Sequence, residues 1–277
     1  MERKIRIIFS TFALIMVGLF VWRIVQGTWS VVNWVMLALS ATACLLVFVR
    51  FVYIFNFSYA LCAIFNGALI WVARPSPATA LIGAIAVLYG LRLFWFTWSR
   101  TRSRSYAPRV ANVEAVDREM PATGKCILWF TCTWLMTFHL MALWLLALQP
   151  TLSAGIITAG IVMFAGTVLE GVADHQKQRS KEVAPEKFVA VGLFARWRHP
   201  NYLGEILFQL GLIIVAVSSA LTADDLVAGL VSPLYIVILM ISEARRVDDY
   251  QITRYGSESA YVDYRARSGS LWPKVLQ

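Results

Sequence analysis

Eight long stretches of the chain consist mainly of apolar residues, with short polar segments between them. Each has about twenty residues, the length that a helix needs to cross a hydrocarbon core of roughly 30 Å. Arg50 and its neighbours are all that separates the second stretch from the third, so seven spans is an open alternative to eight. The pattern predicts an all-α polytopic bundle with spans at about 5–26, 30–50, 52–73, 78–98, 125–148, 152–170, 201–221 and 226–243.

Composition supports a single membrane domain over residues 1–277. The chain is 59% hydrophobic and 15% charged, whereas a soluble domain carries about 25% charged residues. The opening MERKIR and the apolar run to Val25 resemble a signal peptide. The run is too long and has no convincing small-residue cleavage site, so we interpret it as the first span. We expect 1–50 to hold the N-terminal spans and 51–277 the functional bundle.

The net charge of +9 lies almost entirely between the apolar stretches. With eight spans, nearly all Lys and Arg fall on one side, in residues 1–6, 99–125, 171–200 and the tail from Arg245. Because cytoplasmic loops collect basic residues, this side is predicted to be cytoplasmic. The chain is then a multi-pass integral protein of a bacterial inner membrane or its equivalent. Membrane orientation explains the charge better than nucleic-acid binding does.

The two basic loops and the tail are also longer than helix connections need, which points to a function there. Other chemistry is disfavoured. The four cysteines lie inside apolar stretches without CxxC spacing, which argues against disulfides. The three histidines are not clustered for a metal. No GxGxxG or GxxxxGK[ST] sequence indicates a Rossmann or P-loop nucleotide site.

The most informative segment is GLFARWRHPNYLGE at 192–205. Pro200 suits the first turn of a helix. Asn201, Glu205 and Gln209 follow at four-residue spacing and therefore share one face of the helix that enters the membrane. A carboxylate just inside an apolar zone is expensive and usually functional. The basic residues just before this helix predict an anion site at its N-terminus, although a helix cap with snorkelling arginines is the plainer alternative.

Tyr89 and Arg92 lie three residues apart on the fourth span, hence on one face. A phenol beside a buried cation can act as a general acid or donate a hydrogen bond to a carbonyl oxygen. Snorkelling of Arg92 is an equally good explanation of the pair. In FNFSYA on the third span, polar side chains more often bridge helices than react. Glu170 and Asp174 share a helix face, where Asp174 suits either a ribose hydroxyl or a solvated helix end.

Taken together, HPNYLGE, the tail pattern YxxYRxRSxSLWP, YGLR at 89–92 and SYAP at 105–108 resemble the steroid 5α-reductase family, over roughly residues 50–277. The resemblance implies a helical bundle that holds NADPH in a cavity open to the cytoplasm. It implies hydride transfer to the β-carbon of an α,β-unsaturated ketone in a lipid-soluble substrate. A 3-oxo-Δ4 steroid, reduced to its 5α-dihydro product, is the expected substrate; polyprenols, enoyl-CoA thioesters and sterols stay open.

By this resemblance, Tyr89 is the catalytic tyrosine, and Asn201 and Glu205 lie near the nicotinamide and ribose. The family's glutamate on an earlier helix has no counterpart in YIFNFSYA, where Asn56 is the nearest substitute. An amide can donate to the carbonyl oxygen but cannot supply a proton, so proton delivery would rest on Tyr89 and water. The further cofactor contacts implied are Arg100, Arg102, Tyr106, Asp174, Arg179, Arg198, His199, Tyr202, Arg246, Tyr255 and Arg267.

Two other functions compete. S-adenosylmethionine-dependent methyltransferases of the isoprenylcysteine carboxyl or phospholipid type share an RHPxYxG motif, which stands here at 198–204. The glutamate directly after that glycine, YGLR and the arginine-rich first loop favour the reductase. A transporter or lipid-binding protein without chemistry is the second competitor. The expected partners are a lipid-soluble substrate and membrane lipid, with no nucleic acid and no obligate protein partner.

Overall fold

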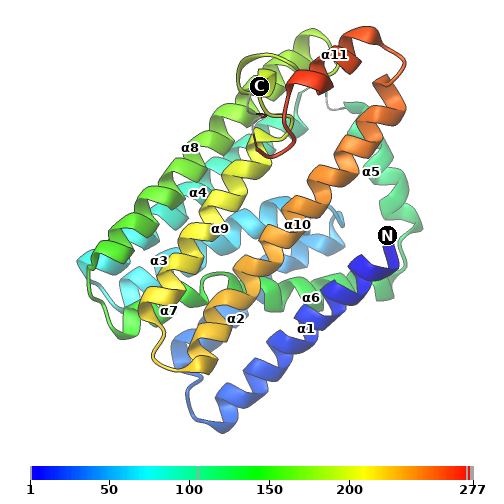
Figure 1. The fold of residues 1–277 in the computed structure, drawn as a ribbon. Helices are drawn as coiled ribbons and strands as arrows, with labels where there is room; N and C mark the ends of the chain where they lie inside the picture. Colours follow the sequence, from blue (N-terminus) through cyan, green and yellow to red (C-terminus); the bar gives the residue numbers. More distant parts are fainter. Residues whose placement is uncertain (1, 104, 106, 273, 275–277) are drawn as a thin grey trace.

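A computed structural model describes residues 2–103, 105, 107–272 and 274, with side chains from residue 11 onward except 108 and 109. The described residues form helices and no strand, gathered into one bundle (Figure 1). The predicted all-α polytopic fold is confirmed. The α-helices are α1 (Glu2–Val25), α2 (Val31–Cys44), α3 (Tyr59–Ala73), α4 (Pro77–Thr101), α5 (Ala107–Glu119), α6 (Ala122–His139), α7 (Met141–Leu148), α8 (Ala154–Val183), α9 (Pro200–Ser219), α10 (Ala223–Tyr255) and α11 (Ser259–Arg267).

Seven segments of the described chain are long and apolar enough to cross a membrane, and α1 adds a shorter apolar stretch at Thr11–Val25. Between α2 and α3 lie the 3-10 helix η1 (Leu45–Phe48), a turn around Arg50 and the π-helix η2 (Ile54–Ser58). The two predicted spans are therefore separate helices, and the alternative that joins them is wrong. The seven segments are 31–48, 54–73, 77–101, 122–148, 154–183, 200–219 and 223–255.

Hydroxyl caps fix where several spans begin. The Ser30 side chain accepts from the Asn33 backbone while the Asn33 side chain accepts from Ser30, a complete capping box. Ser76, Ser153 and Thr222 cap α4, α8 and α10 with a single hydrogen bond each, accepted by the side-chain hydroxyl from a backbone N–H of the first turn. Each cap satisfies a backbone N–H at the first turn of its helix, which has no carbonyl partner within the helix.

The long basic loops are largely helical. α8 continues past residue 170 to Val183, α10 continues to Tyr255, and the first loop and the tail contain α5 and α11. In Figure 1, α5, α11 and the far ends of α8 and α10 gather at one end of the bundle, which we call the α11 end. Residues expected on loops, such as Arg179 and Arg246, therefore stand on rigid helices.

Glycines bring α8 and α9 into backbone contact. A Cβ added at Gly166 would lie 2.5 Å from the Gly204 carbonyl oxygen and 2.7 Å from the Phe208 nitrogen. A Cβ at Gly204 would lie 2.6 Å from the Glu170 Cβ. Such distances are far below ordinary contact, so neither position has room for a side chain. Because Glu205 follows Gly204, this contact also places the carboxylates of the two helices close together.

Candidate functional site

Five polar side chains meet inside the bundle, and we call them the polar cluster: Tyr59, Tyr89, His139, Glu205 and Gln209. They come from α3, α4, α6 and α9, and none is more than 8% exposed. Two of them stand at helix irregularities. Tyr59 directly follows the π-turn η2, and His139 ends α6 where the span breaks before α7. Irregular backbone inside a membrane span is tolerated mainly at functional sites.

The Glu205 carboxylate is the centre of the cluster. Its Oε2 accepts a very short hydrogen bond from the Tyr89 hydroxyl. Its Oε1 accepts from the Tyr59 hydroxyl at 2.8 Å and from the Gln209 amide at 2.6 Å. Three donors on two oxygens fit an ionised carboxylate, which only accepts. The predicted shared face of Glu205 and Gln209 is thereby confirmed.

A second layer surrounds Tyr59. Its hydroxyl oxygen lies 3.2 Å from His139 Nε2 and accepts from Gln209 Nε2 at 2.8 Å. The Tyr59 and His139 rings pack with their centroids 4.9 Å apart. His139 Nδ1 and Gln209 Oε1 are buried without a hydrogen-bond partner in the described part of the chain. The cluster thus ends in one unused acceptor, Gln209 Oε1, and one imidazole nitrogen whose role as donor or acceptor depends on the tautomer.

Arg92 connects the cluster to α8. Its guanidinium lies 2.7 Å from Glu170 and donates to Asp174 at 3.0 Å. Its Cζ stands 5.2 Å from the centroid of the Tyr89 ring, and the same ring stacks on Phe208 with the centroids 4.1 Å apart. The predicted shared face of Tyr89 and Arg92 is confirmed. Asp174 is 5% exposed, so its interpretation as a solvated helix end is wrong.

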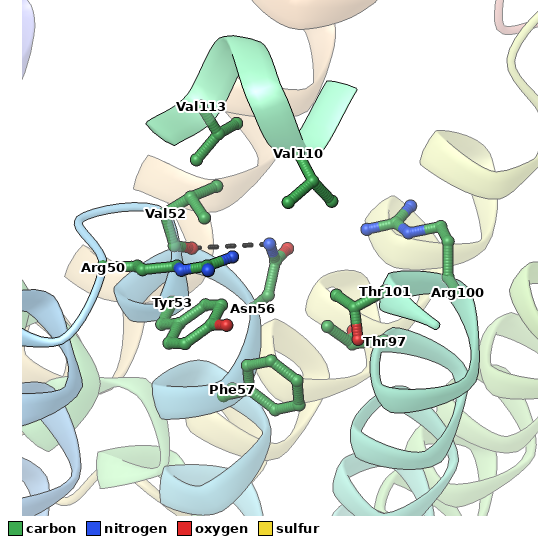
Figure 2. A pocket seen from close by; sticks show the side chains of 10 residues that line it. All are labelled: Arg50, Val52, Tyr53, Asn56, Phe57, Thr97, Arg100, Thr101, Val110 and Val113. Carbon is green, nitrogen blue, oxygen red and sulfur yellow. Dashed lines mark hydrogen bonds between the residues drawn. The ribbon is translucent and has the colours of Figure 1, made fainter. Parts of the chain in front are cut away.

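Asn56 does not join this cluster. It lines a small pocket under α5, where its amide donates to the Val52 carbonyl at 3.4 Å (Figure 2). Arg50 and Arg100 approach this pocket from opposite sides, and its volume of about 20 Å³ suits a single water molecule. The structure brings Glu205, rather than Asn56, to the Tyr89 hydroxyl. Asn56 therefore does not take the position expected for the family's missing glutamate.

Arg198 and His199 hold the chain's own carboxylate instead of standing open before α9. Arg198 donates to both oxygens of Asp248, at 2.8 and 3.0 Å, and to the Ser268 carbonyl at 2.7 Å. His199 Nε2 and the Ser270 hydroxyl bind the same Asp248, at 2.8 and 2.7 Å. Burial lowers the pKa of His199 below its ordinary 6.5, against the opposing attraction of Asp248. The predicted anion is present, but it is Asp248, and it fastens the tail to α9.

Two predicted cofactor tyrosines also have partners within the protein. The Tyr255 hydroxyl donates to the Glu186 carbonyl at 2.8 Å, which ties α10 to the segment before α9. Tyr202 stacks on the His199 ring with the centroids 5.4 Å apart. Both contacts support the packing of the α11 end. Tyr106 lies outside the described residues.

The predicted phosphate-binding arginines are spread over the α11 end rather than gathered into one group. Arg102 lies over the Trp98 ring at 4.0 Å, and the exposed Arg246 pairs with Glu243 at 2.6 Å. Arg179 on α8 and Arg267 on α11 are exposed. A cavity of about 520 Å³ opens beside α11. It is lined by Arg198, Ile252, Gly256, Tyr261, Val262, Arg265, Ala266 and Lys274.

Sequence reasoning did not assign a site role to Tyr59, His139, Gln209 or Glu170. The signal was present for His139 and Glu170, because an ionisable residue inside a predicted span is by default a functional candidate. It was absent for Tyr59, since a tyrosine in an apolar run looks like any other membrane aromatic. The cluster joins residues far apart in sequence, and spacing along one helix cannot reveal such contacts.

The sequence model of a family described as "Protein of unknown function (DUF1295)" matches residues 55–268, which is most of the chain. No curated protein matches the chain. No solved structure matches it either.

Proposed function

The chain belongs to the DUF1295 family, whose function is unknown, and we propose that it is an NADPH-dependent membrane reductase. It would reduce the C=C bond of an α,β-unsaturated ketone in a lipid-soluble substrate, with a 3-oxo-Δ4 steroid as the first candidate. One observation carries the proposal: the buried Tyr89 phenol is held by Glu205 of HPNYLGE. A motif glutamate and a span tyrosine, 116 residues apart, form one hydrogen-bonded pair.

The chain's own side chains are assigned two tasks: to polarise the substrate's carbonyl group and to hold the Glu205 carboxylate in place. NADPH supplies the hydride when bound. The Tyr89 hydroxyl donates to the substrate's carbonyl oxygen, where negative charge develops as the β-carbon is reduced. While Tyr89 turns toward the substrate, Tyr59 and Gln209 keep the Glu205 carboxylate in place through Oε1. The apolar bundle excludes bulk water, which strengthens the donated hydrogen bond. The α-carbon takes its proton from water.

The residues present fit NADPH. Asn201 Oδ1, one turn before Glu205, is a buried acceptor without a hydrogen-bond partner in the described residues. It suits the hydroxyl of a ribose or the N–H of a carboxamide. Arg265 and Lys274 line the cavity of about 520 Å³ and suit phosphates, whereas Arg198 beside them is already held by Asp248. We assign the α11 end to the cytoplasm because the basic loops lie there.

The test is a Tyr89→Phe variant in lipid nanodiscs, assayed for NADPH consumption with testosterone, progesterone and a long-chain enoyl-CoA. Removal of one donor at a developing oxyanion costs on the order of 100- to 1,000-fold in kcat, while NADPH affinity stays near wild type. Tyr250→Phe is the matched control, since that phenol is 57% exposed on α10. Unchanged turnover in Tyr89→Phe would refute the assignment. Turnover with the enoyl-CoA and with neither steroid would refute the steroid as substrate but not the reductase function.

One observation favours methyl transfer from S-adenosylmethionine as the second candidate. The Glu205 carboxylate forms no ion pair with a described Lys, Arg or His, and a sulfonium would supply the missing positive charge. Fluorescence titration separates the two functions. If S-adenosylmethionine quenches the protein's fluorescence and NADPH does not, the protein is a methyltransferase candidate and not a reductase.

A further inference from the structure

Two neighbouring helices form one outer face of the bundle, which we call the α4–α8 face. A Cβ added at Gly160 would lie 3.2 Å from the Leu81 side chain, and a Cβ added at Gly171 would lie 3.3 Å from the Arg92 side chain. These two points of contact are eleven residues apart on each helix. α4 and α8 therefore run parallel and in register, and they lie side by side in Figure 1.

Exposed side chains form a stripe along each of the two helices. With about 100° of rotation per residue, the α4 stripe lies about 80° from the contact with α8. The α8 stripe lies about 80° from the contact with α4 in the opposite sense of rotation, so in parallel helices both stripes point to the same side. The α4 stripe runs from Leu88 through Trp95 and Trp98 to Arg102, and the α8 stripe runs from Ile157 through Val172 to Arg179. Each stripe is apolar along most of its length and ends in an arginine at the α11 end.

The two arginines lie at the depth of lipid headgroups. From Ile157 to Arg179 the α8 stripe is about 33 Å long, slightly more than a hydrocarbon core of roughly 30 Å. By the register of the two helices, Arg102 lies within about 3 Å of the depth of Arg179. Trp95 and Trp98 are 71% and 41% exposed, and they precede Arg102 by about two turns and one turn. Tryptophans gather at this depth in membrane proteins, because it is where the apolar core meets the headgroups.

The charges of these arginines are available to a ligand. Neither Arg102 nor Arg179 forms an ion pair with a residue that the structure describes, whereas Arg92 and Arg198 are bound to carboxylates. The Cζ of Arg102 lies 4.0 Å from the centroid of the Trp98 ring, and this contact holds the guanidinium at the surface. Neither arginine lines the cavity beside α11 or the pocket under α5. Both therefore face outward, away from the interior of the bundle.

The other described ionisable groups on this face leave it positive. Glu182 is exposed near the end of α8, and its carboxylate accepts hydrogen bonds from Gln178 at 2.9 Å and from Ser103 at 3.4 Å. His175 is exposed on the α8 stripe and adds positive charge when it is protonated. Two arginines against one glutamate give a net positive charge, which complements an anionic headgroup better than a zwitterionic one.

We propose that the α4–α8 face binds an anionic phospholipid in the leaflet at the α11 end. Arg102 and Arg179 bind the headgroup phosphate, and the acyl chains lie along the apolar parts of the two stripes. Packed helices lie about 8–10 Å apart, so two long arginine side chains reach one headgroup. A guanidinium binds phosphate oxygens through two parallel N–H groups. Two arginines that the family resemblance implied for the cofactor are thereby assigned to a lipid.

Native mass spectrometry of the full chain in detergent tests the proposal. Phosphatidylglycerol and phosphatidylcholine with the same acyl chains compete at equal concentration. We expect the wild type to bind its first phosphatidylglycerol about tenfold more tightly than phosphatidylcholine, because basic residues near the membrane surface attract anionic lipids. The double variant Arg102→Gln/Arg179→Gln should bind the two lipids about equally. Arg118→Gln, which removes an exposed arginine from α5, should keep the preference.

The wild-type preference tests the proposal without any variant, so a double variant that fails to fold leaves it falsifiable. Equal binding of the two lipids by the wild type, or a preference that survives in the folded double variant, would overturn the proposal. Inorganic phosphate in excess should not displace the lipid, since it has no acyl chains for the stripes. Displacement by phosphate would indicate a site for a soluble anion and would also overturn the proposal. No cofactor or substrate is present, so the result does not depend on the reductase function.

Discussion

Gly204 offers the sharpest test of how the site is built, because the close contact between α8 and α9 depends on it. In Gly204→Ala the new Cβ would lie 2.6 Å from the Glu170 nitrogen and Cβ, and 2.8 Å from the Gly166 carbonyl oxygen. Ordinary contacts begin near 3.4 Å. Backbone atoms cannot rotate away as a side chain can, so α8 and α9 must separate by about 1 Å.

Two opposing effects set the expected change in the free energy of unfolding of Gly204→Ala. Overpacking of this kind destabilises by up to about 3 kcal/mol, while alanine in place of glycine stabilises a helix by about 1 kcal/mol. The net expectation is a loss of about 2 kcal/mol, or a fall in Tm of several degrees. Gly18→Ala on α1 isolates the second term, since nothing lies within 4 Å of its Cβ. That control should melt at or slightly above the wild-type temperature.

The assay is thermal unfolding in nanodiscs by near-UV circular dichroism, followed by turnover of the folded protein. A displacement of about 1 Å between Glu170 and Glu205 should lower turnover by about 100-fold. The reasoning is refuted if the Tm of Gly204→Ala equals or exceeds the Tm of Gly18→Ala. It also fails if Gly204→Ala is destabilised but turns over as fast as wild type, since the helix contact would then not position the site.

Three further predictions follow from the polar contacts. Asp248→Asn removes the anion that fastens the tail, so limited proteolysis should cleave the tail faster. Asp249→Asn, at the exposed neighbouring residue, should be cleaved at the wild-type rate. Burial lowers the pKa of His199, so as the pH falls the unfolded chain protonates this histidine before the folded chain does. The free energy of unfolding therefore keeps its full value above about pH 6.5 and decreases as the pH drops below it. His199→Gln should flatten this dependence in thermal melts between about pH 7.5 and 5.5. Tyr59→Phe should reduce turnover about tenfold, and a loss as large as that of Tyr89→Phe would show that the two phenols share the role.

Features that lie along a single helix could be predicted from sequence. The apolar runs predicted where the seven spans begin to within a few residues, and four-residue spacing placed Glu205 beside Gln209. Hydropathy was a poor guide to where helices end, however. α8 runs on through HQKQRSKE because those polar residues are good helix formers, although they are not apolar. The predicted loops therefore turned out to be helical extensions.

Contacts between helices could not be predicted, and two local irregularities explain why. The π-turn η2 changes the helical register, so a strict 3.6-residue repeat cannot tell whether Asn56 or Tyr59 faces Tyr89. The partner of Arg198 is a further example, since Asp248 lies 50 residues away on α10. An arginine and a histidine before a helix indicate an anion, but they do not say whether it is a ligand or the protein's own side chain.

The position of the irregularities argues that the polar cluster serves a function rather than stability. A bundle that only had to be stable would bury apolar side chains there, because charged groups inside a membrane cost more than they return. Instead, a π-turn directs Tyr59 and a helix break directs His139 toward Glu205, and the Gly166–Gly204 contact holds Glu170 beside it. Four separate segments thus meet at one carboxylate that forms no ion pair with any residue the structure describes. Each departure from regular structure is a cost to folding, and their convergence on Glu205 favours a functional role for that carboxylate over a purely structural one.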